Sequence, residues 1–178
     1  MNSSNLDFSI KFISINIALI TISDTRNIND DKSGDLLKER INKFGHNVTN
    51  KVIIKDDIEK IKSTLINFAN DKLIDVIITT GGTGLTGRDS TPEAVEEICQ
   101  KKISGFGELF RQLSYKKIGT STIQSRALGA IINNTFIFCL PGSPGACKDA
   151  WDDILQFQLD IRHLPCNFIE ILPRLNER

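Results

Sequence analysis

Three short runs of apolar, mostly β-branched residues interrupt the polar background in the first half of the chain. They occupy residues 16–23, 48–54 and 75–80. Apolar runs of this length, without polar alternation, are typical of strands that are buried on both faces of a parallel sheet. We therefore expect all three runs to be strands with both faces covered.

Helical patterns separate these runs. One covers residues 33–44 and ends at Gly45, a residue suited to the left-handed conformation that closes many helices. The next helix begins after Asp56 or Asp57, either of which can cap it. Its apolar residues share one broad face, and they are Ile58, Ile61, Leu65 and Phe68. The alternation of strand and helix predicts an α/β fold, with a mostly parallel sheet wrapped by helices.

More helices are predicted after the third strand. One has Thr91 as its N-cap and Pro92 as its first residue, an arrangement that favours a helix start. A second helix is expected over residues 105–117 and a short one over 120–128. These helices would cover a further part of the sheet.

The remaining sequence predicts a hairpin, a last helix and a tail. Apolar runs at 130–132 and 136–140 flank residues 133–135, Asn-Asn-Thr, which indicates a tight hairpin turn. The last helix follows Ser143-Pro144 and continues to about residue 157. For the tail from residue 159, the sequence leaves two alternatives, an edge strand or an arm at a subunit interface.

Length and composition fit one globular domain. The chain has 178 residues, of which 40% are hydrophobic and 25% charged, and this balance excludes a disordered or fibrous protein. We expect a polar N-terminal extension over residues 1–14 and one domain over residues 15–178. The 22 basic and 22 acidic side chains cancel, which argues against a broad surface for nucleic acid or for an anionic membrane.

The apolar run near the N-terminus, residues 15–22, is too short to span a bilayer, so we expect a soluble, cytoplasmic protein. The four cysteines form no C-x-x-C pair, which argues against zinc and predicts free thiols, three of them buried. His46 follows Gly45 in a predicted turn, where we expect it to be exposed to solvent.

Three of the predicted loops follow strands at the same edge of the sheet, where ligands bind in open parallel sheets. Their candidate ligand-binding residues are Ser23 and Asp24 in the first, Gly81, Gly82, Thr83 and Gly84 in the second, and Gly142 and Ser143 in the third. Glycines let a backbone approach a ligand closely, and hydroxyl and amide groups suit an anion. Three such loops together favour a ligand that carries phosphate.

The second loop resembles two familiar phosphate motifs but fails both in context. Residues 82–87 match G-x-G-x-x-G, yet the next helix starts only near Pro92, which makes an NAD-dependent oxidoreductase remote. Arg88-Asp89 stands where a P-loop requires Lys-Ser/Thr. What remains suits nucleotidyl transfer, with Arg88 free to pair with phosphates and Asp89 able to hold Mg²⁺. Asp56 is the natural second carboxylate for the metal.

The motifs together resemble the MoaB/Mog family of molybdenum cofactor biosynthesis. The matching segments are residues 79–84 (TTGGTG), 88–89 (RD), 91–94 (TPEA), 22–26 (ISDTR), 105–108 (GFGE), 125–126 (SR) and 140–144 (LPGSP). They occur in order from the first strand to the last helix. The resemblance implies a doubly wound α/β sheet that binds molybdopterin, with a homotrimer or homohexamer as the assembly. It also implies other proteins of the pathway as partners.

The resemblance also suggests roles for individual residues. Asp89 is similar to the carboxylate that is essential for adenylyl transfer from Mg-ATP to molybdopterin. Asp56 is similar to the second carboxylate, with Asp57 as a one-residue alternative. Residues 81–84 would hold the nucleotide phosphates, and Ser125, Arg126 and Ser143 are similar to positions near the pterin.

The tail resembles the B branch of the family, in which some members resemble active adenylyltransferases and others have lost the activity. Both aspartates are present here, which favours adenylyl transfer. The alternative is a non-catalytic carrier or scaffold that binds the pterin or a nucleotide. The sequence leaves the nucleotide open between ATP and GTP.

Overall fold

The computed structural model describes residues 6–177 and contains one six-stranded sheet in the order β2-β1-β3-β6-β5-β4. The strands are β1 (Asn16–Ile22), β2 (Asn47–Ile54), β3 (Val76–Thr80), β4 (Lys101–Ile103), β5 (Leu128–Ile132) and β6 (Thr135–Leu140). Strands β2, β1, β3 and β6 run parallel, whereas β5 is antiparallel to both β6 and β4. The predicted α/β fold with a mostly parallel, doubly wound sheet is confirmed.

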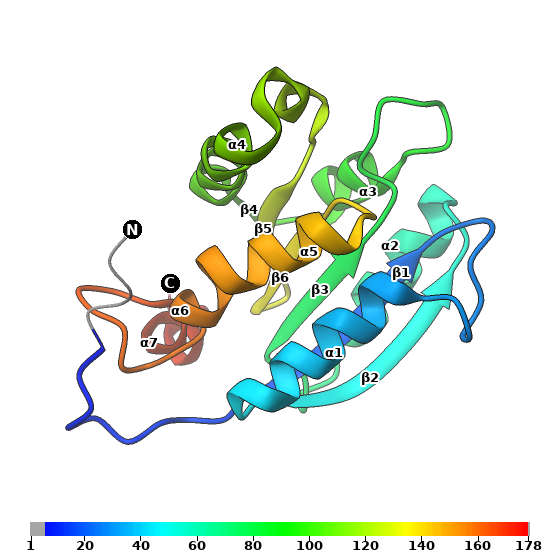
Figure 1. Ribbon diagram of the computed structural model, residues 1–178. Helices are drawn as coiled ribbons and strands as arrows, with labels where there is room; N and C mark the ends of the chain where they lie inside the picture. Colours follow the sequence, from blue (N-terminus) through cyan, green and yellow to red (C-terminus); the bar gives the residue numbers. More distant parts are fainter. Residues whose placement is uncertain (1–5, 178) are drawn as a thin grey trace.

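Helices cover both faces of the sheet (Figure 1). One face carries α1 (Lys32–Phe44), α4 (Ser104–Ile118) and α5 (Pro144–Ala150), which continues through the π-helical turn η2 (Trp151–Leu155) into α6 (Gln156–Gln158). The other face carries α2 (Ile58–Ala69) and α3 (Thr91–Ile98). Each face has its own hydrophobic core, built around Leu19, Phe138 and Trp151 on the first and around Ile20, Ile61 and Ile77 on the second.

The central strands fit the sequence prediction better than the edge strands. All five residues of β3 are buried, but β2 lies at the edge of the sheet and only Ile54 within it is buried, so its predicted double coverage was wrong. The three-residue strand β4 was not predicted, because two of its three side chains are exposed lysines. A strand this short and polar carries no hydrophobic pattern.

The predicted hairpin is confirmed between β5 and β6. Its turn is Asn133-Asn134, two residues with φ of 47° and 68°, and Thr135 already belongs to β6. Two consecutive left-handed residues are the signature of a type I′ turn, for which asparagine is well suited. The short helix predicted over residues 120–128 is instead the 3₁₀ helix η1 (Gly119–Gln124).

The N- and C-terminal segments pack together at the amino-terminal end of the strands. Leu6 forms a bridge with His163, and the amide of Asp7 donates to the carbonyl of Arg162 at 2.8 Å. The tail forms α7 (Phe168–Ile171) and the 3₁₀ turn η3 (Leu172–Arg174), so it is not an edge strand. Of the predicted extension, residues 1–5 lie outside the described residues.

His46 is buried at this end of the sheet, so the prediction of an exposed histidine was wrong. Its exposed fraction is 2%, and its ring stacks on Phe12 with centroids 5.1 Å apart. Trp151 and Phe44 complete the surrounding aromatic cluster. Burial lowers the pKa of His46 to about 4, against a smaller opposing effect of Asp160. The imidazole is therefore neutral at physiological pH.

Candidate functional site

The loops that follow β1, β3 and β6 meet at the carboxyl edge of the parallel strands. The amide of Gly81 donates to the carbonyl of Leu140 at 3.0 Å, which joins the second loop to the third. The guanidinium of Arg26 donates to the carbonyl of Gly142 at 2.7 Å, which joins the first loop to the third. Parallel pairing places all three strand ends on one edge, so three segments distant in sequence surround one place.

A cavity of about 560 Å³ opens between this edge and the helices α4 and α5. The predicted site residues that line it are Gly81, Gly82, Thr83, Gly84, Asp89, Ser125, Gly142 and Ser143. Its volume falls within the range of small-molecule sites. The cavity therefore has room for a ligand of nucleotide or pterin size.

The glycine loop has a shape that other residues cannot adopt. Gly81 and Gly82 have φ of 105° and 64°, and a Cβ on Gly81 would lie 2.1 Å from the carbonyl oxygen of Ile22. Successive backbone amides in such a loop can form a concave group of donors for an anion. Thr91, predicted as the N-cap of α3, is instead its first residue, and its hydroxyl donates to the carbonyl of Gly81 at 3.0 Å. This bond helps to hold the loop.

Asp89 lies at the rim of the cavity with its carboxylate fixed. The amide and the hydroxyl of Thr86 both donate to its Oδ2, at 2.9 and 2.6 Å. These hydrogen bonds, chiefly that of the hydroxyl, lower the pKa of Asp89 below its ordinary value despite partial burial. The carboxylate is therefore ionised at neutral pH and presents a negative charge to the cavity.

Asp56 lies behind the glycine loop and does not line the cavity. It is buried, and its Oδ1 accepts from both the amide and the hydroxyl of Ser90, at 3.1 and 2.7 Å. A Cβ on Gly82 would lie 2.7 Å from its Oδ2, so the two residues are in close contact. Asp57 is exposed and caps α2 by accepting from the amide of Lys60 at 2.8 Å. Of the two aspartates, Asp56 is the one that contacts the glycine loop.

The sequence analysis predicted that Arg88 is free to pair with phosphates, but the structure shows it paired with a carboxylate. Its guanidinium donates to both carboxylate oxygens of Asp24, at 2.9 and 2.7 Å, and this pair lowers the pKa of Asp24. Neither residue lines the cavity. Ser23 is also directed to its own loop, where its hydroxyl oxygen accepts from the amides of Thr25 and Arg26. Ser23 and Asp24 of the first loop thus stabilise neighbouring segments and do not line the cavity.

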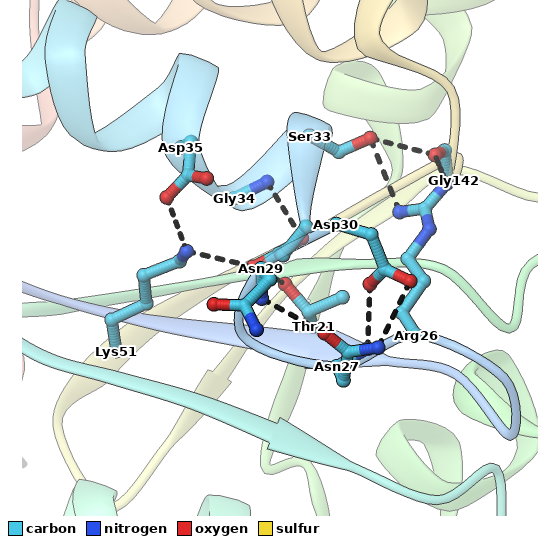
Figure 2. A network of polar contacts seen from close by, with 11 residues as sticks. Thr21, Arg26, Asn27, Asn29, Asp30, Ser33, Gly34, Asp35, Lys51 and Gly142 are labelled. Carbon is cyan, nitrogen blue, oxygen red and sulfur yellow. Dashed lines mark hydrogen bonds and ion pairs between the residues drawn. The ribbon is translucent and has the colours of Figure 1, made fainter.

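Figure 2 shows the polar network that gives this support. Asp31 is fully buried, accepts from the hydroxyl of Thr21 at 2.9 Å and from the amide of Gly34 at 3.0 Å, and pairs with Lys51 at 3.0 Å. Beside it, the guanidinium of Arg26 and the hydroxyl of Ser33 both donate to the carbonyl of Gly142, at 2.7 and 2.8 Å. The network fixes the start of α1 and ties it to the third loop.

Arg126 likewise stabilises a loop, the segment 84–89, by hydrogen bonds to its backbone. Its guanidinium donates to the carbonyls of Gly84 and Asp89, each at 2.8 Å, and pairs with Glu93. These bonds hold both ends of the segment 84–89. Ser125 lines the cavity itself, while Arg126 does not.

Sequence reasoning missed the wall that α4 and α5 supply. Phe110, Ser114, Lys117 and Ile118 of α4 line the cavity opposite the glycine loop. Their spacing of four, three and one places them on one helical face, and that pattern was the available signal. From α5 come Ala146 and Asp149, three residues apart. Lys117 joins the two helices by pairing with Asp149 at 2.6 Å and with Asp153 at 2.9 Å.

The described residues, 6–177, also bear on the predictions about metal ligands and thiols. Within them, no group of three or more His, Cys, Asp or Glu side chains is arranged to hold a metal ion. All four cysteines are free, but only Cys139 and Cys147 are buried, while Cys99 is half-buried and Cys166 exposed. In the same part of the chain, no helix has both the length and the apolar character needed to cross a membrane.

Comparison with known proteins decides the family. The family model described as "Probable molybdopterin binding domain" matches residues 18–161. The chain belongs to the MoaB/Mog family of molybdenum cofactor biosynthesis proteins. It is 43% identical over 160 residues to molybdenum cofactor biosynthesis protein B of Escherichia coli K12, covering 90% of this chain and 94% of the relative. The protein of that name from Bacillus cereus is 45% identical over 142 residues, or 79% and 84% of the two chains.

Solved structures of the family share the fold. A crystal structure of molybdenum cofactor biosynthesis protein B superposes with a TM-score of 0.83 at 39% identity, covering 93% of this chain and 98% of that one. The tungsten cofactor synthesizing protein MoaB of Pyrococcus furiosus has a TM-score of 0.71 at 35% identity, covering 79% and 90%. The family resemblance seen in the sequence motifs is therefore confirmed.

Proposed function

We propose that this protein binds molybdopterin in the cavity at the carboxyl edge of the sheet and adenylylates it with Mg-ATP. The observation that carries the proposal is the cavity itself, in which a glycine loop and an ionised Asp89 lie side by side. Membership of the MoaB/Mog family supports molybdopterin as the ligand. Phosphoryl and nucleotidyl transfers depend mainly on positioning and on neutralising charge, which such a site can supply.

The residues present divide this work between backbone and side chain. The amides of residues 81–84 would hold the phosphates, because their loop approaches the cavity without side chains at three of four positions. Asp89 would hold Mg²⁺, a cation that is commonly bound by one or two carboxylates together with phosphate oxygens. The donor set fits, since the Asp89 carboxylate lines the cavity and is kept charged. When bound, the cation would neutralise phosphate charge in the transition state.

A second candidate function is binding without catalysis, as a carrier or scaffold of the same pathway. The observation in its favour is that two groups expected to act are already engaged. Asp56 accepts two hydrogen bonds from Ser90 behind the glycine loop, and Arg88 is paired with Asp24. A binding protein would need only the cavity.

The experiment that separates the two is a single reaction with the purified protein, molybdopterin, Mg²⁺ and either ATP or GTP. We expect adenylylated molybdopterin, detected by mass spectrometry, and a loss of about 100-fold or more in its rate of formation in Asp89→Asn. Asp71→Asn, an exposed loop carboxylate remote from the cavity, is the matched control and should retain the rate. Binding of molybdopterin without any nucleotidylated product would overturn the transfer reaction and leave the carrier.

The assembly, the compartment and the pathway partners stay predictions. A homotrimer or homohexamer would give three or six times the chain mass of 19.9 kDa in sedimentation equilibrium. The nucleotide preference follows from a further reaction, in which ATP and GTP compete in one mixture.

A further inference from the structure

The wall of the cavity formed by α4 and α5 carries polar groups that the proposed nucleotidyl transfer does not use. Asp149 of α5 and Ser114 of α4 both line the cavity. Around them lie the apolar side chains of Phe110 and Ile118 from α4 and of Ala146 from α5, together with Lys117. Small-molecule sites commonly combine apolar walls with a few polar groups that fix the orientation of a ring.

Asp149 retains hydrogen-bonding capacity toward the cavity. Its Oδ1 accepts from the ammonium of Lys117 at 2.6 Å, and its Oδ2 has no side-chain or backbone partner among residues 6–177. The side chain is 22% exposed, so it is neither buried in the protein nor fully in water. A carboxylate has about four lone-pair positions, and one of them is occupied here. Both oxygens can therefore accept from a ligand.

Ser114 offers a second polar group on the facing helix. Its residue is 6% exposed, and it lines the cavity. A hydroxyl that lines a cavity can donate one hydrogen bond and accept others from water or a ligand there. The wall thus presents the Asp149 carboxylate, the Ser114 hydroxyl and the Lys117 ammonium, which is already paired with Asp149 and Asp153.

The ring edge that matches a carboxylate is one with two adjacent N–H donors. A 2-amino-4-oxopyrimidine has such an edge, because its ring N–H and its exocyclic amino group point the same way, and pterins and guanine share it. Adenine presents a donor beside an acceptor nitrogen, whose lone pair would face a carboxylate oxygen. A bidentate pair with a charged acceptor is among the stronger hydrogen-bonded contacts in proteins.

We propose that the part of the cavity between α4 and α5 takes the 2-amino-4-oxopyrimidine edge of a heterocycle, with Asp149 as the bidentate acceptor. The proposal rests on the proposed binding of molybdopterin in this cavity. It makes Asp149 a specificity-determining residue. Lys117 positions the carboxylate from α4 and offsets its charge.

The test uses small ring compounds in place of the full ligand. Pterin and lumazine differ in that lumazine carries a 2-oxo group where pterin has the 2-amino group, and both fluoresce. We expect the native protein to bind pterin about tenfold or more tightly than lumazine in a fluorescence titration. Guanosine monophosphate and inosine monophosphate form a second pair that differs by the same amino group, and they report whether a guanine base uses the site instead.

Two variants of neighbouring aspartates give the decisive comparison. Asp149→Asn replaces one acceptor oxygen by an amino group and should abolish the preference for the 2-amino compound. Asp153→Asn removes a carboxylate that pairs with the same Lys117 ammonium, at 2.9 Å, but does not line the cavity. It should keep the preference. Thermal unfolding of both variants checks that each is folded.

The outcomes separate this inference from the proposed function. If the native protein adenylylates molybdopterin but binds pterin and lumazine equally, the inference about Asp149 is overturned and the function stands. The inference is also overturned if Asp149→Asn and Asp153→Asn lose the preference to the same extent. If the preference for pterin is present but no product forms, Asp149 keeps its role and only the transfer reaction falls. Absence of binding by all four compounds overturns the inference outright.

Discussion

The two ends of the sheet use polar residues in opposite ways. At the carboxyl end, the loops after β1, β3 and β6 surround a cavity, and the groups that line it, such as Asp89 and Asp149, retain contact with solvent. At the amino end, His46 lies inside an aromatic cluster with Phe12, Phe44 and Trp151. One end keeps its hydrogen-bonding capacity for a ligand. The other encloses its polar groups in the protein interior, where Nε2 of His46 has no hydrogen-bond partner among residues 6–177.

The ion pair of Asp160 and Arg162 illustrates the amino end. Asp160 is fully buried, and although burial opposes it, the Arg162 guanidinium holds the pKa of that carboxyl below its ordinary value. The guanidinium in turn lies over the rings of Phe8 and Phe12, at 5.4 and 4.9 Å from their centroids. All these contacts are internal. Changes at this end should therefore alter stability and leave ligand binding intact.

Asp31 tests the comparison most severely, because it is a fully buried charge at the carboxyl end. Removing one member of a buried pair leaves the other without its partner, and we expect Asp31→Asn to lower the free energy of unfolding by about 3 kcal/mol or more. Asp35 pairs with the same Lys51 ammonium but is 61% exposed, so Asp35→Asn should cost less than about 1 kcal/mol. Urea unfolding of both variants measures the difference.

Equal losses in the two variants would contradict this reasoning. They would mean that burial does not determine the contribution of these carboxylates. The distinction between the buried network around Asp31, which stabilises the fold, and the residues that line the cavity would then not hold. Ligand binding at saturating concentration should survive in both variants, since neither residue lines the cavity.

His46 gives the next largest effect, and it depends on pH. Its folded-state pKa of about 4 lies below the value near 6.5 of an unfolded histidine. As the pH falls from 6.5 toward 4, the unfolded chain takes up a proton that the folded protein does not, so folding loses about 3 kcal/mol across this range. Above pH 6.5 this group contributes no pH dependence. Urea unfolding at pH 7.5, 6.5, 5.5 and 4.5 follows the change.

The control for this prediction is His46→Gln. Glutamine can keep an acceptor for the amide of Ile15, which donates to Nδ1 of His46 at 3.3 Å, but it does not titrate. The variant should show a shallower fall in stability between pH 6.5 and 4.5 than the native protein. Parallel pH profiles would show that His46 is not the group responsible.

Much of the fold could be predicted because its signals are local. The buried runs of β1 and β3, the closing Gly45 of α1 and the Asn-Asn turn each lie within a few residues of sequence. Strand β4 could not be predicted, since its three residues pair with β5 only after the chain has folded. The burial of His46 likewise depends on Phe12 and Trp151, which are 34 positions before it and 105 after it.

The site was predictable in its loops and less so in its side chains. Parallel strands place their carboxyl ends together, so the glycine loop, Gly142 and Ser143 could be assigned to one edge. The ion pair between Arg88 and Asp24 joins residues 64 positions apart, and no local sequence pattern predicts it. Asp149 was missed for the same reason, because α5 meets α4 only in the folded chain.

Arg26 gives the smallest of these effects and asks whether the first loop acts on the cavity through the third. Arg26→Lys keeps the charge but loses the forked geometry that reaches both Ser33 and the carbonyl of Gly142, at 3.2 and 2.7 Å. We expect the affinity for molybdopterin to fall about tenfold. Gly142 and Ser143 line the cavity, and the variant loses one of the two hydrogen bonds that the carbonyl of Gly142 accepts. Arg40→Lys is the matched control, since Arg40 pairs with Asp152 away from the cavity, and it should bind normally. An unchanged affinity in Arg26→Lys, with unfolding shifted as in Arg40→Lys, would place Arg26 with the amino-end residues, as a group that serves stability alone.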